Sequence, residues 1–85
     1  MAQVTPSPAP NPDAMKFTLD RTLEGRRNYA SAAEAVGDAF AEAVFAAPGV
    51  AAVFGVNDFV TVTRQKGAEW APIIDAVSRA AEEHL

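Results

Sequence analysis

The sequence contains no cysteine and a single histidine, and both shortages restrict its chemistry. Without cysteine, these residues cannot form disulfide bonds, thiolate metal sites or a cysteine nucleophile. The one histidine, His84, is the penultimate residue, where chain ends fray, which argues against a catalytic or metal-ligating role. Ser31 and Ser78 have no positioned base that would activate a hydroxyl nucleophile. We therefore predict no enzymatic activity, no cofactor and no dedicated metal site.

Basic residues and long apolar runs are also scarce. Lys and Arg number 7 against 11 Asp and Glu, which gives a net charge of −4. This balance argues against a nucleic-acid-binding domain, which normally presents a basic face. No apolar run approaches the roughly 20 residues of a membrane helix, and the N-terminus lacks the basic and apolar regions of a secretory signal. We expect a soluble, cytoplasmic, monomeric protein without nucleic-acid or membrane partners.

Large apolar side chains are few, although the chain is 49% hydrophobic, because 19 of its 85 residues are alanine. A chain of this length forms one domain with a single modest core. Each large side chain should therefore supply a sizeable share of the buried area. The predicted core consists of Phe17, Phe40, Phe54, Trp70, Ile74 and Val77.

Proline is concentrated at the N-terminus, where four of the six prolines lie at alternating positions from Pro6 to Pro12. Proline opposes regular strand pairing and favours extended polyproline-like conformations. We predict a disordered tail over residues 1–9, followed by a folded domain over residues 10–85. A ligand for a proline-binding groove is the alternative interpretation of the tail.

Residues 15–20 alternate between apolar and polar side chains, which predicts a half-buried strand. A weaker, polar strand is expected over residues 26–30, and its charges suit a sheet edge. Lys16, Arg21, Arg26 and Arg27 make this the one mildly basic region of the chain. It is either a solvated edge or a docking site for an acidic partner.

A helix is predicted over residues 32–46, with a capping box of Ser31 and Glu34 at its start and Pro48 after its end. Glu34, Asp38 and Glu42 then share one face at helical spacing. These carboxylates are either a solvated face or weak oxygen ligands for a cation such as iron. Phe45 falls on the acidic side and should fold over the helix end or anchor a partner.

Residues 49–65 predict a β-hairpin in the middle of the sheet, with strands over residues 50–55 and 59–64. Asn57 and Asp58 tolerate the positive φ of a tight turn, and Gly55 permits a bulge. A final helix is predicted over residues 69–84, because Pro72 is acceptable only in a first turn. Helices before and after the hairpin should fold onto its sheet, which makes this a small α+β domain.

Four separated motifs resemble one family. The segment PNPDAMKF, with Pro10-Asn11-Pro12 followed by Met15-Lys16-Phe17, is similar to the TPNPxxxKF opening of the N-terminal domain of Nfu/NifU-like iron–sulfur scaffold proteins. VFAAPGV is similar to that family's LFxIxGV, and VFGVNDFVTVTR to its VFFGxDFITVTK. A helix led by tryptophan follows, as in the family, so the resemblance covers residues 10–85. Ala9 departs from the usual threonine.

The resemblance implies a ββαββα fold, in which a four-stranded antiparallel sheet carries two helices on one face. Common Nfu proteins also have a second domain with a CxxC pair that holds a cluster, and these 85 residues contain no such pair. The resemblance therefore implies a non-catalytic accessory domain that assists cluster assembly or delivery by contacting other proteins. It supplies no catalytic residues. A protein- or peptide-binding adaptor outside that pathway, or a weak surface iron-binding protein, are the alternatives.

A partner would find an aromatic residue among threonines on the sheet face without helices. We assume that the apolar residues Met15, Phe17, Leu19, Val60 and Val62 point toward the helices. Alternation then places on the other face Lys16, Thr18, Phe59, Thr61 and Thr63. Arg26 and Arg27 on the edge strand would then provide cations at its border. Such a surface suits a partner with an apolar anchor and acidic flanks. The predicted partner-binding residues are Lys16, Arg26, Arg27, Phe59, Thr61 and Thr63, and the competing interpretation is a solvated face.

Overall fold

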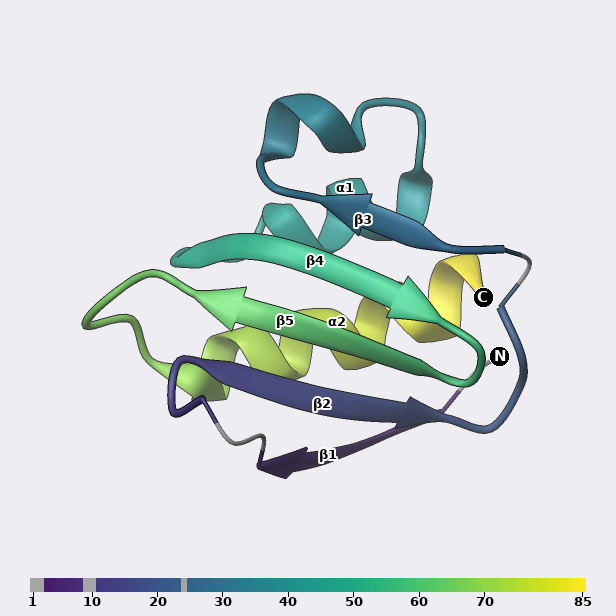
Figure 1. Ribbon diagram of the computed structural model, residues 1–85, viewed down its shortest axis with the longest axis horizontal. Coiled ribbons are helices and arrows are strands. Elements are labelled where there is room, and N and C mark those ends of the chain that lie inside the picture. Colours follow the sequence, from purple (N-terminus) through teal and green to yellow (C-terminus); the bar gives the residue numbers. More distant parts are fainter. Residues whose placement is uncertain (1–2, 9–10, 24) are drawn as a thin grey trace.

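Five antiparallel strands form one sheet, and both α-helices lie behind it in the view of Figure 1. The structure is a computed structural model that describes residues 3–8, 11–23 and 25–85. The strands are ordered β1-β2-β5-β4-β3 across the sheet. In chain order the elements are β1 (Val4–Pro8), β2 (Ala14–Leu19), β3 (Arg27–Tyr29), the 3-10 helix η1 (Ala32–Ala35), α1 (Ala39–Phe45), β4 (Val50–Val56), β5 (Phe59–Arg64) and α2 (Trp70–His84).

The first strand, β1, corrects the prediction of a four-stranded sheet preceded by a disordered tail. Val4–Pro8 pairs along the outer side of β2, with Pro6 opposite Phe17. Proline is tolerated at a sheet edge because only one side of an edge strand needs ladder hydrogen bonds. Because Pro6 and Pro8 alternate with Thr5 and Ser7, the N–H groups of Thr5 and Ser7 point to the same side of β1. This arrangement is compatible with pairing on one side only. Residues 1, 2 and 9 of the predicted tail lie outside the described residues.

The central hairpin is confirmed. β4 and β5 pair in register through Val56 and Phe59, and Asn57 in the turn adopts the positive φ (55°) that such turns need. β5 lies in the middle of the five strands. The bulge that Gly55 would permit does not form there, because Gly55 pairs regularly with Val60 and the register shift lies between Val50 and Ala52.

The predicted helix over residues 32–46 is wrong as one element. The chain forms the single turn of η1, breaks over residues 36–38, and begins again as α1. Gly37 adopts a left-handed φ of 99°, which ends the first piece. Asp38 then caps α1 by accepting a hydrogen bond from the Ala41 N–H (3.2 Å), whereas Ser31 makes no side-chain capping bond. Val36 lies in this break and is 76% exposed.

The core lies between the sheet and the two helices. Phe17 from β2, Phe40 from α1 and Val77 from α2 are buried there, as predicted. Trp70 and Ile74 are half-buried and pack against the core from its edge. Phe54 is the wrong member of the predicted set, since its register position puts it opposite Thr61 on the other face of the sheet. The buried core residues are Phe17, Leu19, Leu23, Phe40, Val44, Val50, Val53, Val60, Val62, Ile73, Val77, Ala80 and Ala81.

The last helix, α2, confirms the prediction of a helix over residues 69–84 to within one residue. Pro72 lies in its first turn, where a missing N–H costs no intrahelical bond. Among the described residues, no helix is long and apolar enough to cross a membrane.

Candidate partner-binding surface

The sheet face opposite the helices is the candidate surface, and strand alternation decides which side chains form it. Phe17, Val60 and Val62 are buried against the helices, so their neighbours in the strands point the other way. The five residues that alternation predicted for this face therefore lie on it, and register places further side chains from β1, β3 and β4 beside them. The open face comprises Thr5, Ser7, Ala14, Lys16, Thr18, Asn28, Ala52, Phe54, Val56, Phe59, Thr61 and Thr63.

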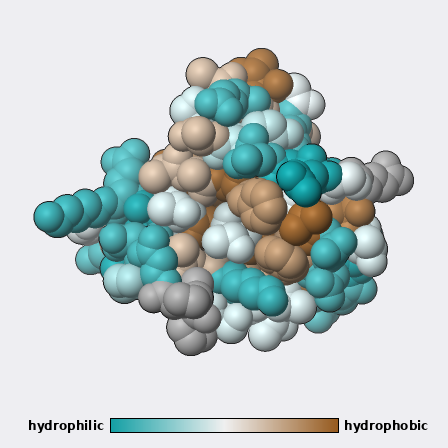
Figure 2. All heavy atoms as spheres, viewed as in Figure 1, coloured by the Kyte–Doolittle hydropathy of each residue, from teal (hydrophilic) through white to brown (hydrophobic). Residues whose placement is uncertain are grey.

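An apolar cluster occupies the middle of this face. The rings of Phe54 and Phe59 are 6.4 Å apart between centroids and tilted at 49° to each other. Val56 is the direct cross-strand partner of Phe59. All three side chains are half-buried, so part of each remains accessible. Figure 2 looks onto this face and shows apolar residues over the middle strands with hydrophilic residues around them.

Lys16 joins the cluster through its ammonium group. Its Nζ lies 4.7 Å from the centroid of the Phe59 ring, within the range of a cation–π interaction. Among the described strand residues of the open face, Lys16 alone carries a charge. We call Phe54, Val56, Phe59 and Lys16 the open-face patch. Threonines on β2 and β5 flank this patch and offer hydroxyl groups for hydrogen bonding.

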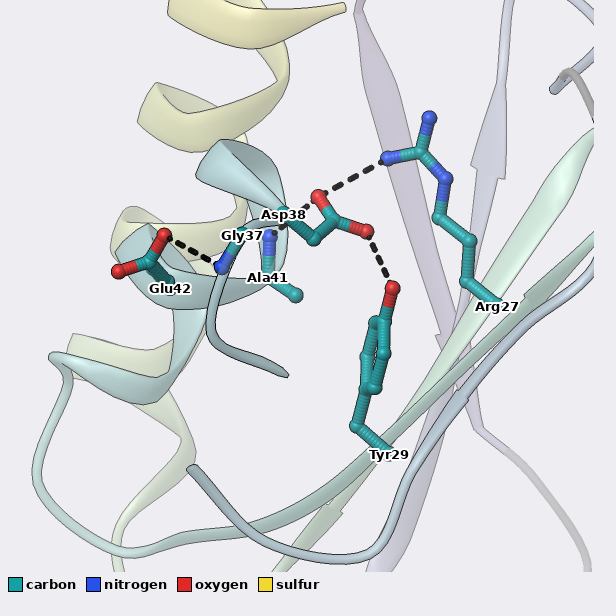
Figure 3. A network of polar contacts seen from close by, with 6 residues as sticks. All are labelled: Arg27, Tyr29, Gly37, Asp38, Ala41 and Glu42. Carbon is teal, nitrogen blue, oxygen red and sulfur yellow. Dashed lines mark hydrogen bonds and ion pairs between the residues drawn. The ribbon is translucent and has the colours of Figure 1, made fainter. Parts of the chain in front are cut away.

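Arg27 corrects the predicted border of cations. Its register position opposite Gly55 turns it toward the helices, where its guanidinium donates to Asp38 Oδ1 (3.2 Å). The Tyr29 hydroxyl donates to Asp38 Oδ2 (2.8 Å), so one carboxylate joins β3 to the start of α1 (Figure 3). This hydrogen bond, followed by burial, raises the pKa of Tyr29 above its usual value. Arg26, immediately before β3, is exposed.

The acidic residues that the sequence placed on one helix face are not gathered into a site. Glu34 Oε1 accepts from the Ala30 N–H (3.4 Å), and Glu42 Oε2 accepts from the Gly37 N–H (3.3 Å). Asp38 is held by its own three donors (Figure 3). Among the described residues, no three acidic, histidine or cysteine side chains are arranged to hold a metal ion. The break at residues 36–38 is the physical reason, since it removes the common helix face.

Sequence reasoning missed Phe54 and Val56 as members of the open face. A large apolar residue in an alanine-rich chain was assigned to the core, although Val53 and Gly55 alternate with Phe54 in β4. The sequence offered one signal, the glycine at position 55. In the structure Gly55 is buried, and its lack of a side chain leaves room for Leu23 against the strand. Reading Gly55 as an inward position would have turned Phe54 and Val56 outward.

Comparison with known proteins gives the family. Residues 4–85 match the family model described as "Scaffold protein Nfu/NifU N terminal". The chain belongs to this family. Its Nfu/NifU N-terminal domain includes β1, which lies before the first residue of the predicted domain.

Relatives and solved structures of the Nfu/NifU N-terminal domain agree with this assignment. Proteins named "NFU1 iron-sulfur cluster scaffold homolog, mitochondrial" from Drosophila ananassae and Drosophila persimilis are 37% and 36% identical over 67 residues, which are 75% of this chain. The match covers 23% and 24% of those proteins, so the chain spans about a quarter of their length. The crystal structure of protein SAV1430 from Staphylococcus aureus is 28% identical, with a TM-score of 0.76 over 92% of this chain and 96% of that one. SeR13 from Staphylococcus epidermidis, at 22% identity and a TM-score of 0.60 over 93% of each chain, shares the fold.

Proposed function

We propose that this domain is a non-catalytic protein-binding module of iron–sulfur cluster assembly. The observation that carries the proposal is the family match, which extends over residues 4–85 and so includes every element of the described fold. Relatives that carry this domain are named iron–sulfur cluster scaffold homologs. The domain would contribute by contacting the proteins that build, carry or receive the cluster.

The donor groups of this chain support contact as its role, with the cluster as cargo. Iron–sulfur clusters are held mainly by cysteine thiolates, and these 85 residues contain none. The carboxylates considered as an alternative, Glu34, Asp38 and Glu42, accept hydrogen bonds from separate backbone and side-chain donors. Their positions do not fit a shared iron ion, because no three acidic, histidine or cysteine side chains of the described residues are grouped closely enough to hold one. The cluster ligands would therefore come from a partner or from another domain.

An adaptor outside the cluster pathway is the second candidate, because a partly accessible aromatic patch can serve partners of many kinds. Isothermal titration of the purified domain against cluster-assembly proteins of the same organism separates the two. The panel should contain a cysteine-bearing scaffold, a cluster carrier and an apo-acceptor. Unrelated proteins of similar net charge are the control.

The proposal expects saturable binding to at least one assembly protein and none to the charge-matched controls. Absence of binding to every assembly protein, with and without a loaded cluster, would reject the pathway and favour the adaptor. Equal binding to assembly and control proteins would indicate nonspecific association and would also reject it.

A further inference from the structure

The composition of the open face is unusual for a domain with so few large apolar residues. The chain has five phenylalanines, and two of them, Phe54 and Phe59, point away from the core formed between sheet and helices. A solvated sheet face favours threonine and charged residues, as its neighbouring positions Thr61 and Thr63 illustrate. Folding alone gives no reason to place two aromatic side chains there. Phe54, Val56 and Phe59 are contiguous and each is half-buried, so part of every side chain remains accessible on this face. Contiguous accessible apolar side chains on a surface can mark interaction sites.

We infer that the open-face patch docks an acidic segment of a partner protein, with an apolar side chain of that segment inserted against Phe54, Val56 and Phe59. The identity of the partner as an assembly protein rests on the proposed function. The chemistry of the segment rests on the patch itself.

The patch is held ready for binding. β4 and β5 are interior strands, hydrogen-bonded to neighbours on both sides, so their backbones are fixed before a partner arrives. The rings of Phe54 and Phe59 contact each other, and Lys16 lies over Phe59. A partner therefore loses little binding free energy to ordering this surface. Aromatic residues, phenylalanine included, are enriched in the cores of protein interfaces.

Charge selects an acidic partner for this face. The chain has a net charge of −4, yet the described strand positions of the open face carry one charge, and it is positive. The helices on the other side of the sheet carry exposed carboxylates, including Glu42 and Glu82. An acidic segment is repelled there and attracted toward Lys16.

The patch also gives the segment a direction. Asp58 is exposed in the turn directly before Phe59, whereas Lys16 pairs opposite Thr61, further from the turn. The acidic flank of the segment should therefore lie over Lys16, and its apolar anchor over the Phe54–Phe59 contact. A second copy of this chain is a poorer occupant, because face-to-face packing brings two Lys16 side chains and two acidic molecules together.

Chemical-shift mapping with matched variants tests the inference. The ¹⁵N-labelled domain is titrated with two probes: the assembly protein that binds in calorimetry, and a synthetic peptide with a central Leu-Phe flanked by aspartates. A peptide with lysines in place of the aspartates is the charge control. Phe59→Thr and Lys16→Glu change the patch. Val36→Thr and Lys66→Glu make the same kinds of change at exposed positions elsewhere.

The inference expects shifts confined to β2, β4 and β5 with both probes. Phe59→Thr should weaken binding by at least about tenfold, as expected for a hot-spot side chain, and Lys16→Glu should weaken it and reduce its salt dependence. The two control variants should bind within about twofold of the original, as surface positions outside an interface do. Circular dichroism of each variant checks that the fold is retained.

Several outcomes would overturn the inference. Shifts on the helices around Glu42, unchanged affinity in a folded Phe59→Thr variant, equal binding of the lysine peptide, or no shifts with either probe would each do so. Sedimentation that shows a dimer dispersed by Phe59→Thr would assign the face to a second copy. If an assembly protein binds through the helices, the proposed function survives without this site. If no assembly protein binds in calorimetry and the aspartate peptide still binds through the patch, the site survives and the proposed function fails.

Discussion

Replacing Phe40 with alanine should remove a large part of the stability of this domain. Phe40 is 2% exposed and lies in the core between α1 and the sheet. Truncating a buried phenylalanine costs about 3–5 kcal/mol, because transfer free energy is lost and a cavity remains. At roughly 0.05–0.15 kcal/mol per residue, an 85-residue domain has about 4–13 kcal/mol in total. The variant should therefore lie close to the limit of folding.

Urea unfolding followed by circular dichroism measures this loss, with the single tryptophan, Trp70, as a second probe. Phe54→Ala is the matched control, because it removes the same atoms from a half-buried position on the open face. We expect the control to lose less than half as much free energy of unfolding as Phe40→Ala. Equal losses, or a midpoint that barely moves for Phe40→Ala, would refute the assignment of Phe40 to the core and of Phe54 to the open face.

Three further predictions concern the links between elements. Asp38→Ala removes the cap of α1 and leaves the Arg27 and Tyr29 donors without their acceptor. The free energy of unfolding should fall by about 2–3 kcal/mol. Unchanged amide exchange in α1 would contradict this prediction. The pKa of Tyr29 is raised in the folded state, so the protonated phenol stabilises the folded domain. This contribution to the free energy of unfolding is fully present below the pKa of unfolded tyrosine, about 10, and is lost as pH rises through the pKa of Tyr29 in the folded domain. Tyr29→Phe should lack this alkaline loss, and a tyrosinate titration of the single tyrosine that matches the unfolded value would refute the shift. At Gly49 the backbone has a positive φ (88°), and an added side chain would overlap Ala68. Gly49→Ala should therefore lower the free energy of unfolding by about 2–4 kcal/mol, measured by thermal unfolding. Gly67→Ala is the control, because its surroundings are open, and an equal cost of the two changes would show that the overlap is absent.

The hairpin and α2 could be predicted from the sequence because local patterns and tertiary packing agree there. Alternating Val60 and Val62 mark the buried face of β5, and Asn57 marks the turn. Pro72 limits where α2 can begin. Such agreement between local preference and final environment is what makes a segment predictable.

The remaining errors arise where a long-range contact decides the structure. Pro6 and its neighbours form β1 only because β2 offers an open edge. Asp38 accepts hydrogen bonds from Arg27 and Tyr29 because both residues lie on β3, which runs beside the start of α1. Nothing in the spacing of 11 residues between Arg27 and Asp38 indicates this contact. Register places the predicted β2 and β5 residues on the open face and turns Arg27 away from it. Phe54 was missed because apolar residues were assumed to point inward.

Gel filtration of the domain with a cluster-loaded assembly protein, under anaerobic conditions, tests the central claim most directly. Iron, sulfide and protein are measured in every fraction. The claim predicts that the domain co-elutes with its partner, that the iron content per partner is unchanged, and that fractions of free domain contain no iron above the blank, since the chain has no thiolate. Elution of the domain by itself, or stoichiometric iron and sulfide in the free-domain fractions, would contradict it.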